Sequence, residues 1–434
     1  MAELKIPKRL SGAILNSLTG GVVPRAGLEY ITVGRRQEIA ALLGDIESIG
    51  EGGSSFRFIS GRYGSGKSFL LQVIRNYAME KGFVVADADL SPERRLTGSK
   101  GEGLATYKEL MHSLSTKTQT EGGALQLIIE KWISGIQSDV LRDSPQDALF
   151  ESRVERRILD AVEGMRGMVN GFDFARAVTT YWQAYRQGDD ALKSAVLKWF
   201  RGEYPTKTDA KRELGVNVIV SDENWYDSLK LMAQFMLMAG YKGLLVILDE
   251  LVNLYKLPNT VTRQYNYEKL LTMYNDTMQG RAHHIGIFAG VTPQCIEDTR
   301  RGLFSYEALK SRLEAGRFST GFHDVLGPVI RLETLTNEEQ LLLVEKLAAI
   351  HASHYGYAQR VTHDELIAFM KAELSRAGAD TLITPREITR DFLEMLNILF
   401  QNPDKTLEGV LGGFKFTDDA GAEKVGEDFA EFKL

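Results

Sequence analysis

Short apolar runs along the chain predict the buried strands of a parallel sheet. One run begins at Phe56, and others cover residues 82–89, 243–248 and 285–291. Apolar residues at helical spacing follow the first run as far as Leu71, and they precede it from residue 38 to residue 46. Apolar strands that alternate with amphipathic helices are typical of sheets covered on both faces. The pattern therefore predicts an α/β fold in which helices flank a parallel sheet.

A long helical region separates the second apolar run from the third. A strand–helix–strand unit needs on the order of 30 residues, and the gap between residues 90 and 243 is far longer. We expect residues 91–240 to form a mainly helical insertion that packs on the sheet. Its helices are predicted at residues 105–114, 124–136, 150–162, 172–185, 190–200 and 222–238, with Ser144-Pro145 and Asp189-Asp190 as N-terminal caps.

The loop at residues 92–103 opens this helical region and carries three cations. Arg94, Arg95 and Lys100 lie there among three glycines. Such a loop suits a contact with nucleic acid or with a partner protein. A solvated loop is the alternative interpretation.

Helical patterns return after the last apolar run. They cover residues 337–355, 363–377 and 385–400, which suits a small helical domain. Thr384, followed by Pro385, predicts the start of the last long helix. The expected domains are residues 1–90 (an N-terminal segment and the first part of the sheet core), 91–240 (the insertion), 241–332 (the second part of the core), 333–402 (a helical lid) and 403–434 (an acidic tail).

Composition narrows the class of protein without naming a function. The 434 residues are 44% hydrophobic and 25% charged, as in ordinary soluble proteins. The single cysteine, Cys295, excludes an intrachain disulfide. We find neither a secretory leader nor an apolar run of membrane-spanning length, so we expect a cytoplasmic protein with no membrane partner. The net charge of −6 argues against nucleic-acid binding by bulk charge but leaves a local basic groove open.

The first apolar run leads into a complete phosphate-binding pattern. Residues 61–68 read G-x-x-x-x-G-K-S, between a predicted strand and a predicted helix. Glycines let the backbone N–H groups converge on phosphate oxygens at the positive end of the helix. We expect Lys67 to reach the β- and γ-phosphates of ATP and Ser68 to hold Mg²⁺. The candidate nucleotide contacts in this stretch are Gly61, Gly64, Ser65, Gly66, Lys67, Ser68 and Phe69.

A second motif ends the third apolar run. Five apolar residues precede Asp249 and Glu250, which is the Walker B pattern. The carboxyl ends of parallel strands form the ligand edge of an open sheet. We expect Asp249 to bind Mg²⁺ directly or through water, and Glu250 to act as general base on the attacking water.

Two further segments resemble parts of AAA+ ATPases. Val33-Gly34-Arg35, ahead of a helix, is similar to the adenine-side region of the origin-recognition and STAND kinds, so Val33 and Arg35 are candidate nucleotide contacts. A solvated arginine pair is the alternative. Thr292 follows the fourth apolar run where the sensor 1 residue stands in AAA+ proteins, although a threonine that caps a turn before Pro293 fits equally.

The same resemblance implies catalytic arginines. Arg312, in the segment Ser-Arg-Leu, is the first candidate for an arginine finger that completes a neighbouring subunit's site, and Arg301 is the second. A surface salt bridge is the alternative for either. Arg386, at the start of the last long helix, is the candidate for the lid's sensor 2 arginine, with Arg390 as its rival.

A more specific likeness extends across most of the chain. It rests on VPRAGLEYITVGRRQEI, ISGRYGSGKSFLL, LKWFRGEYPTK with the nearby LGV, GYKGLLVILDEL and LITPREITR. These segments resemble the ATP-binding proteins of BREX-type phage-defence loci, the BrxD-like family. The resemblance implies an AAA+ ATPase encoded beside a helicase and acting against foreign DNA.

Three classes of function follow as hypotheses. The first is an ATPase with ATP and Mg²⁺ as cofactors, which assembles as a homo-oligomer. Its candidate partners are a helicase or another defence-locus protein, and DNA. The second is a slowly hydrolysing, nucleotide-gated adaptor. The third, a metabolic kinase on the same core, is disfavoured because sensor and lid candidates are present and no small-molecule acceptor site is evident.

Overall fold

The chain folds into two units, one built on a β-sheet and one made of helices. The computed structural model describes residues 6–143, 149–165, 168, 170–316, 324–375 and 383–413. The sheet unit is Gly34–Thr334, and the helical unit combines Met1–Val33 with Leu335–Leu434. Residues 1–33, which we expected beside the first part of the sheet core, thus group with the C-terminal helices.

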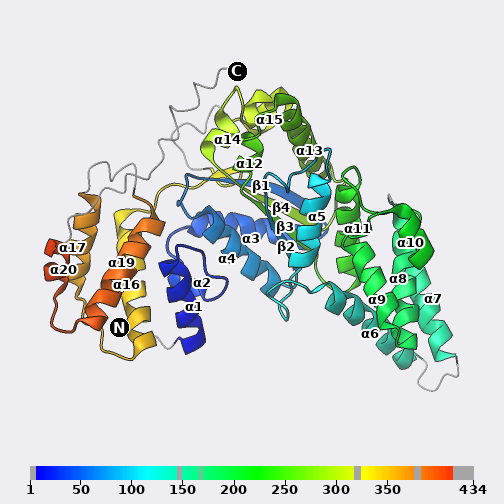
Figure 1. Ribbon diagram of the computed structural model, residues 1–434, viewed down its shortest axis with the longest axis horizontal. Helices are drawn as coiled ribbons and strands as arrows, with labels where there is room; N and C mark the ends of the chain where they lie inside the picture. Colours follow the sequence, from blue (N-terminus) through cyan, green and yellow to red (C-terminus); the bar gives the residue numbers. More distant parts are fainter. Residues whose placement is uncertain are drawn as a thin grey trace. The chain divides into compact units, whose positions relative to one another are not determined.

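Five parallel strands form the centre of the sheet unit (Figure 1), in the order β2-β3-β4-β1-β5. The predicted α/β class, a parallel sheet flanked by helices, is confirmed. The short edge strand β5 was not predicted, because three residues are too few for a periodic signal. The strands are β1 (Ser54–Ser60), β2 (Val84–Asp89), β3 (Leu244–Asp249), β4 (Ile285–Val291) and β5 (Val329–Arg331).

Side chains alternate between the two faces of this sheet, and each face is covered by helices. Ile59 and Phe288 belong to the face packed on α3 (Arg36–Gly50) and α4 (Lys67–Glu80). The opposite face includes Phe58 and Val246 and packs on three helices, α5 (Glu102–Ser113), α11 (Trp225–Met238) and α13 (Thr260–Met278). Each large apolar side chain that is fully buried contributes about 1.5–3 kcal/mol, so both layers hold the strands firmly.

Between β2 and β3, the described residues of the sheet unit form a series of helices. Their apolar side chains join the core on one face of the sheet, so this region and the strands share one hydrophobic cluster. The side chain of Asp189 accepts a hydrogen bond from the Leu192 N–H (2.9 Å), as its predicted capping role requires. Ser144, the other predicted cap, lies outside the described residues. The remaining helices here are α6 (Leu125–Asp143), α7 (Phe150–Glu163), α8 (Gly171–Gln187), α9 (Asp190–Phe200) and α10 (Lys207–Leu214).

The basic loop at residues 92–103 is anchored to its surroundings. The Asp222 carboxylate accepts hydrogen bonds from the N–H groups of Gly98 (2.6 Å) and Gly103 (2.8 Å). Leu96 is fully buried, and its carbonyl accepts a bond from the indole of Trp225 (2.9 Å). The loop is therefore packed into the sheet unit at Leu96, while Lys100 is exposed, and its contact with nucleic acid or a partner protein stays a prediction.

The helical unit joins the two ends of the chain. Helix α1 (Lys8–Thr19) packs against α16 (Asn337–Tyr355) and α19 (Pro385–Gln401). Three of its helices begin with the same capping box, in which a threonine and a glutamate three residues later satisfy each other's backbone N–H groups. The pairs are Thr336 with Glu339 in α16, Thr362 with Glu365 in α17 (His363–Leu374), and Thr384 with Glu387 in α19. The described part of the unit also contains α2 (Leu28–Ile31) and α20 (Leu407–Gly413).

Candidate functional site

The loop at residues 61–68 joins β1 to α4 with a tight backbone. Gly64 (φ 75°) and Gly66 (φ 94°) lie in the left-handed region that favours glycine. A side chain on Gly61 would collide with the hydroxyl of Ser65. The sequence therefore needs its glycines at these positions to bring the loop around the positive end of α4.

Polar groups converge inside this loop. The Lys67 ammonium donates to the carbonyls of Gly61 (2.9 Å) and Arg62 (3.0 Å). Burial lowers the pKa of Lys67, and the nearby carboxylates of Asp249 and Glu250 oppose that shift. The buried Ser65 hydroxyl has no hydrogen-bond partner among the described residues. A buried polar group without a partner in a glycine-rich loop suits a polar ligand.

Asp249 links the loop to the end of β3. Its Oδ2 accepts a hydrogen bond from the Ser68 hydroxyl (2.6 Å), and its Oδ1 accepts one from the Glu250 N–H (2.8 Å). The neighbouring strand leaves room for this carboxylate only because residue 290 is glycine, since a Cβ there would collide with Oδ1. We did not single out Gly290 from the sequence, although a glycine within a strand signals close approach of another group.

Glu250 departs from the strand in a strained conformation. Its φ of 59° is uncommon for a residue other than glycine and costs on the order of 1–3 kcal/mol. Burial raises the pKa of Glu250, Asp249 and Asp89 raise it further, and Lys67 and Lys256 oppose the shift. Such strain is typical of functional positions, where the surrounding structure holds a side chain in place.

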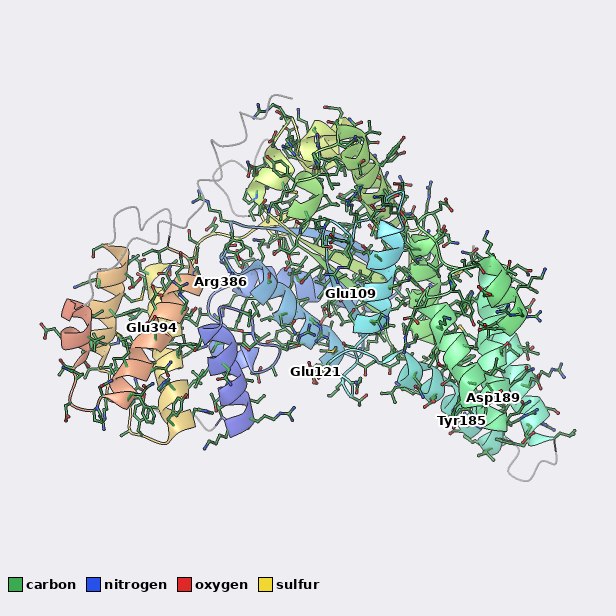
Figure 2. The ribbon with its side chains drawn as sticks, viewed as in Figure 1. Glu109, Glu121, Tyr185, Asp189, Arg386 and Glu394 are labelled. Atoms are coloured by element: carbon green, nitrogen blue, oxygen red, sulfur yellow. The ribbon has the colours of Figure 1, made fainter. Side chains whose placement is uncertain are left out.

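Asp89 is a third carboxylate at this edge of the sheet. It stands opposite Asp249 in the register of β2 and β3. Burial raises the pKa of Asp89, as do Asp249, Asp87 and Glu109, while Arg94 lowers it. Arg94 itself pairs with Glu109 of α5 at 2.8 Å, and Figure 2 labels that glutamate. Asp89 is a site residue that the sequence motifs alone did not indicate.

The donor set fits a magnesium nucleotide. A serine hydroxyl and a carboxylate are the oxygen ligands that Mg²⁺ prefers, and Ser68 and Asp249 already lie within hydrogen-bond distance of each other. Lys67 and the positive end of α4 complement phosphate charge. When bound, Mg²⁺ neutralises negative charge on the phosphates.

Arg35 approaches the loop from the start of α3. Its guanidinium donates to the carbonyls of Ser65 (3.2 Å) and Glu333 (2.6 Å), and to the Glu38 carboxylate (3.2 Å). Arg35 thus contacts the phosphate-binding loop, while its predicted contact with nucleotide stays a prediction.

Thr292 follows β4, which lies between β3 and β1. Its hydroxyl accepts a hydrogen bond from the Cys295 N–H (3.3 Å) at the start of α14 (Pro293–Glu297). This bond agrees with the capping interpretation, and a sensor role stays a prediction.

The two candidate arginine fingers have different surroundings. Arg312 is exposed on α15 (Glu307–Leu313) and donates to Asn275 Oδ1 (3.0 Å) and to the Ala308 carbonyl (2.6 Å). Arg301 is partly buried, and its guanidinium lies 5.5 Å from the centre of the Tyr255 ring. The geometry therefore keeps Arg312 as the candidate that can face another molecule.

Three other candidates belong to the helical unit. The guanidinium of Arg386, labelled in Figure 2 on α19, packs against Gly21, where a Cβ would lie 3.2 Å from its Nε and Nη2 atoms. Arg390 donates to Asp391 (3.2 Å), and Val33 is buried. Their roles at a nucleotide stay predictions.

A strand–loop–helix phosphate site on a five-stranded parallel sheet is consistent with a P-loop NTPase-like fold. The chain matches the family described as BREX system ATP-binding protein BrxC/D over residues 6–414, and it belongs to that family. This confirms the BREX resemblance, whereas the likeness to origin-recognition and STAND ATPases stays a prediction. A search of curated proteins gave no match. Among the described residues, no helix is both long and apolar enough to cross a membrane.

Proposed function

We propose that this chain is a Mg²⁺-dependent ATPase. The observation that carries the proposal is the direct bond between Ser68 of the phosphate-binding loop and Asp249 of the Walker B strand, with Glu250 next in the chain. The family description supports ATP binding and a role in the BREX system. Hydrolysis is supported by the position of Glu250, whose N–H bonds to the Asp249 carboxylate at the end of β3. The direction of its pKa shift agrees with a role as proton acceptor.

Four side chains have distinct roles in the proposed hydrolysis of ATP. Lys67 would hold a positive charge beside the phosphates, and Ser68 and Asp249 would hold Mg²⁺. Glu250 would orient the attacking water and accept its proton as the water bonds to the γ-phosphorus and ADP leaves. The energy of this cycle would drive assembly or remodelling on DNA, together with a helicase or another protein of the defence locus. Arg312 would complete the site of a neighbouring copy in a homo-oligomer.

A slowly hydrolysing adaptor is the second candidate. Both candidate arginine fingers have partners within their own chain, which favours this function. Arg312 donates to Asn275, and Arg301 packs on Tyr255. If neither arginine leaves these contacts, ATP binding would build a scaffold and hydrolysis would only reset it.

One experiment separates the two functions. ATP turnover is measured with and without single-stranded and double-stranded DNA, and the mass of the protein is determined in ATP and in ADP. The ATPase function predicts multiple turnovers that DNA stimulates, together with ATP-dependent assembly. Assembly in ATP with turnover that is very slow and insensitive to DNA would favour the adaptor. Absence of ATP binding under all conditions would contradict both.

A further inference from the structure

We infer that Arg35 is a positioning residue that ties the phosphate-binding loop to both places where the chain passes between its two units. The inference rests on the proposed function for that loop. It adds a way in which ATP binding at the loop changes the backbone near residue 333. It goes beyond a nucleotide contact, because the residue acts through main-chain carbonyls of the protein itself.

The two crossings of the chain meet at this residue. The sheet unit begins at Gly34 and ends at Thr334, so Arg35 is the second residue after one crossing and Glu333 is the second residue before the other. The Arg35 Nη2 donates to the Glu333 carbonyl at 2.6 Å, across 298 positions of sequence. Within the sheet unit, the entry and the exit of the chain are therefore joined by a single side chain.

The same nitrogen also reaches the phosphate-binding loop. Nη2 donates to the Ser65 carbonyl at 3.2 Å, and Nη1 donates to Glu38 Oε1 at 3.2 Å. The side chains of Arg35 and Glu38 are only 9% and 7% exposed. A buried guanidinium with three partners in fixed directions holds them to one geometry, whereas a lysine offers only a single point charge. We therefore expect a displacement of the Ser65 carbonyl to displace the Glu333 carbonyl as well, because the same nitrogen donates to both.

An uncommon backbone conformation at residues 34 and 35 sets the direction of the Arg35 side chain. Gly34 and Arg35 both have a φ of 61°, so two successive residues lie in the left-handed region just before α3 begins. Glycine adopts this conformation readily, but arginine does so only when its surroundings hold it there. The Glu38 carboxylate, one turn into α3, supplies that hold through the ion pair with Arg35.

Hydrogen exchange of the full chain tests the inference in two arms. Arg35→Ala removes all three hydrogen bonds. Arg35→Lys keeps a positive charge beside Glu38 but lacks the planar set of guanidinium donors. The second variant keeps the test valid if Arg35→Ala fails to fold. Arg36→Ala is the matched control, since it removes an exposed arginine one residue away. Without nucleotide, exchange in the peptide covering residues 332–337 should rise roughly tenfold or more in both Arg35 variants relative to Arg36→Ala, as expected when a bond to a charged group is lost.

In the second arm, saturating ATP with Mg²⁺ should slow exchange in the loop peptide 61–68 and in the 332–337 peptide of the wild type and of Arg36→Ala. In the Arg35 variants, only the loop peptide should respond. If the 332–337 peptide of folded Arg35 variants exchanges and responds as in the wild type, the coupling is wrong. If ATP alters exchange in no wild-type peptide, the proposed function of the loop fails. The first arm, which needs no nucleotide, still tests whether the hydrogen bonds of Arg35 hold the segment at residues 332–337.

Discussion

The hydroxyl of Ser68 donates a 2.6 Å hydrogen bond to the carboxylate of Asp249, although 181 positions of sequence separate them. This contact joins the start of α4 to the end of β3. Because Asp249 also accepts the Glu250 N–H, the next carboxylate is fixed relative to the loop. One buried side chain thus sets the geometry on which the proposed metal site and the proposed base both depend.

Asp249→Asn should weaken nucleotide binding in a way that depends on Mg²⁺. The amide keeps the shape of the carboxylate but loses the charge that a hard cation prefers. We expect at least a tenfold loss of affinity for ATP with Mg²⁺ and little change in the presence of a chelator, measured by titration calorimetry. Asp364→Asn, on an exposed position of α17, is the control and should behave as the wild type. Equal Mg²⁺ dependence in the two variants would contradict the metal-site assignment.

Lys67→Ala should abolish tight ATP binding. The substitution removes the loop's ammonium, which now bonds to the carbonyls of Gly61 and Arg62 and which we expect to move to the phosphates. Fluorescent-nucleotide titration measures the loss. Lys81→Ala, at the end of the same helix and half exposed, should retain wild-type affinity. If Lys67→Ala binds ATP as the wild type does, the P-loop assignment is wrong.

Arg312→Ala should lower turnover by as much as roughly 10³- to 10⁵-fold, if the residue completes a neighbouring site as a finger. Its effect on stability should stay within about 0.5 kcal/mol, because the side chain is exposed. Arg301→Ala should instead destabilise the fold, since its side chain packs on Tyr255. Steady-state turnover and thermal unfolding of both variants check this contrast.

Mixing variants tests the finger across an interface. Subunits with Arg312→Ala and subunits with Glu250→Gln should together recover activity, because an interface that combines an intact Glu250 with an intact Arg312 can form. No recovery, together with a wild type that is a fully active monomer, would rule the finger out.

The stability of the helical unit should fall as the solution becomes acidic. His351 is 1% exposed and bonds to the Tyr357 hydroxyl (2.8 Å) and to Asn397 (3.1 Å). Burial lowers its pKa and a nearby histidine lowers it further, although the bond to Asn397 opposes the shift. Below a pH of about 6.5, the unfolded chain therefore takes up a proton that the folded chain resists, and stability is lost as the pH falls through that range.

Thermal unfolding at pH 8 and at pH 5.5 measures this effect. The difference in unfolding temperature should be smaller for His351→Gln than for the wild type. His283→Gln, an exposed position, serves as the control and should keep the wild-type difference. If the two variants show the same difference, burial of His351 does not contribute to acid sensitivity.

The sheet and the proposed nucleotide site were the most predictable parts of the molecule. β4 was predicted with its observed bounds, Ile285–Val291, because an apolar run with turns at both ends leaves little freedom. The phosphate-binding pattern carries its own spacing, so Lys67 and Ser68 could be named from sequence alone. Local patterns of this kind depend only on neighbouring residues.

Long-range relationships were not predictable in the same way. No local signal indicates that Asp89 stands opposite Asp249, that Gly290 makes room for that carboxylate, or that Arg35 reaches Glu333. The grouping of residues 1–33 with the C-terminal helices is of the same kind, because packing between distant segments determines it. The anchoring of the basic loop could not be predicted either, because the bond to the Leu96 carbonyl comes from Trp225, which is far away in sequence.

ATP turnover by the wild type and by Glu250→Gln, with Mg²⁺ and under single-turnover conditions, shows whether this chain is an ATPase that uses Glu250 as its base. Glu268→Gln, an exposed position on α13, is the matched control. We expect both substituted proteins to bind ATP, Glu268→Gln to hydrolyse it at the wild-type rate, and Glu250→Gln to be slower by at least roughly 10²- to 10⁴-fold. Hydrolysis by Glu250→Gln at the wild-type rate, or a wild type that binds ATP and never hydrolyses it, would contradict the proposed ATPase.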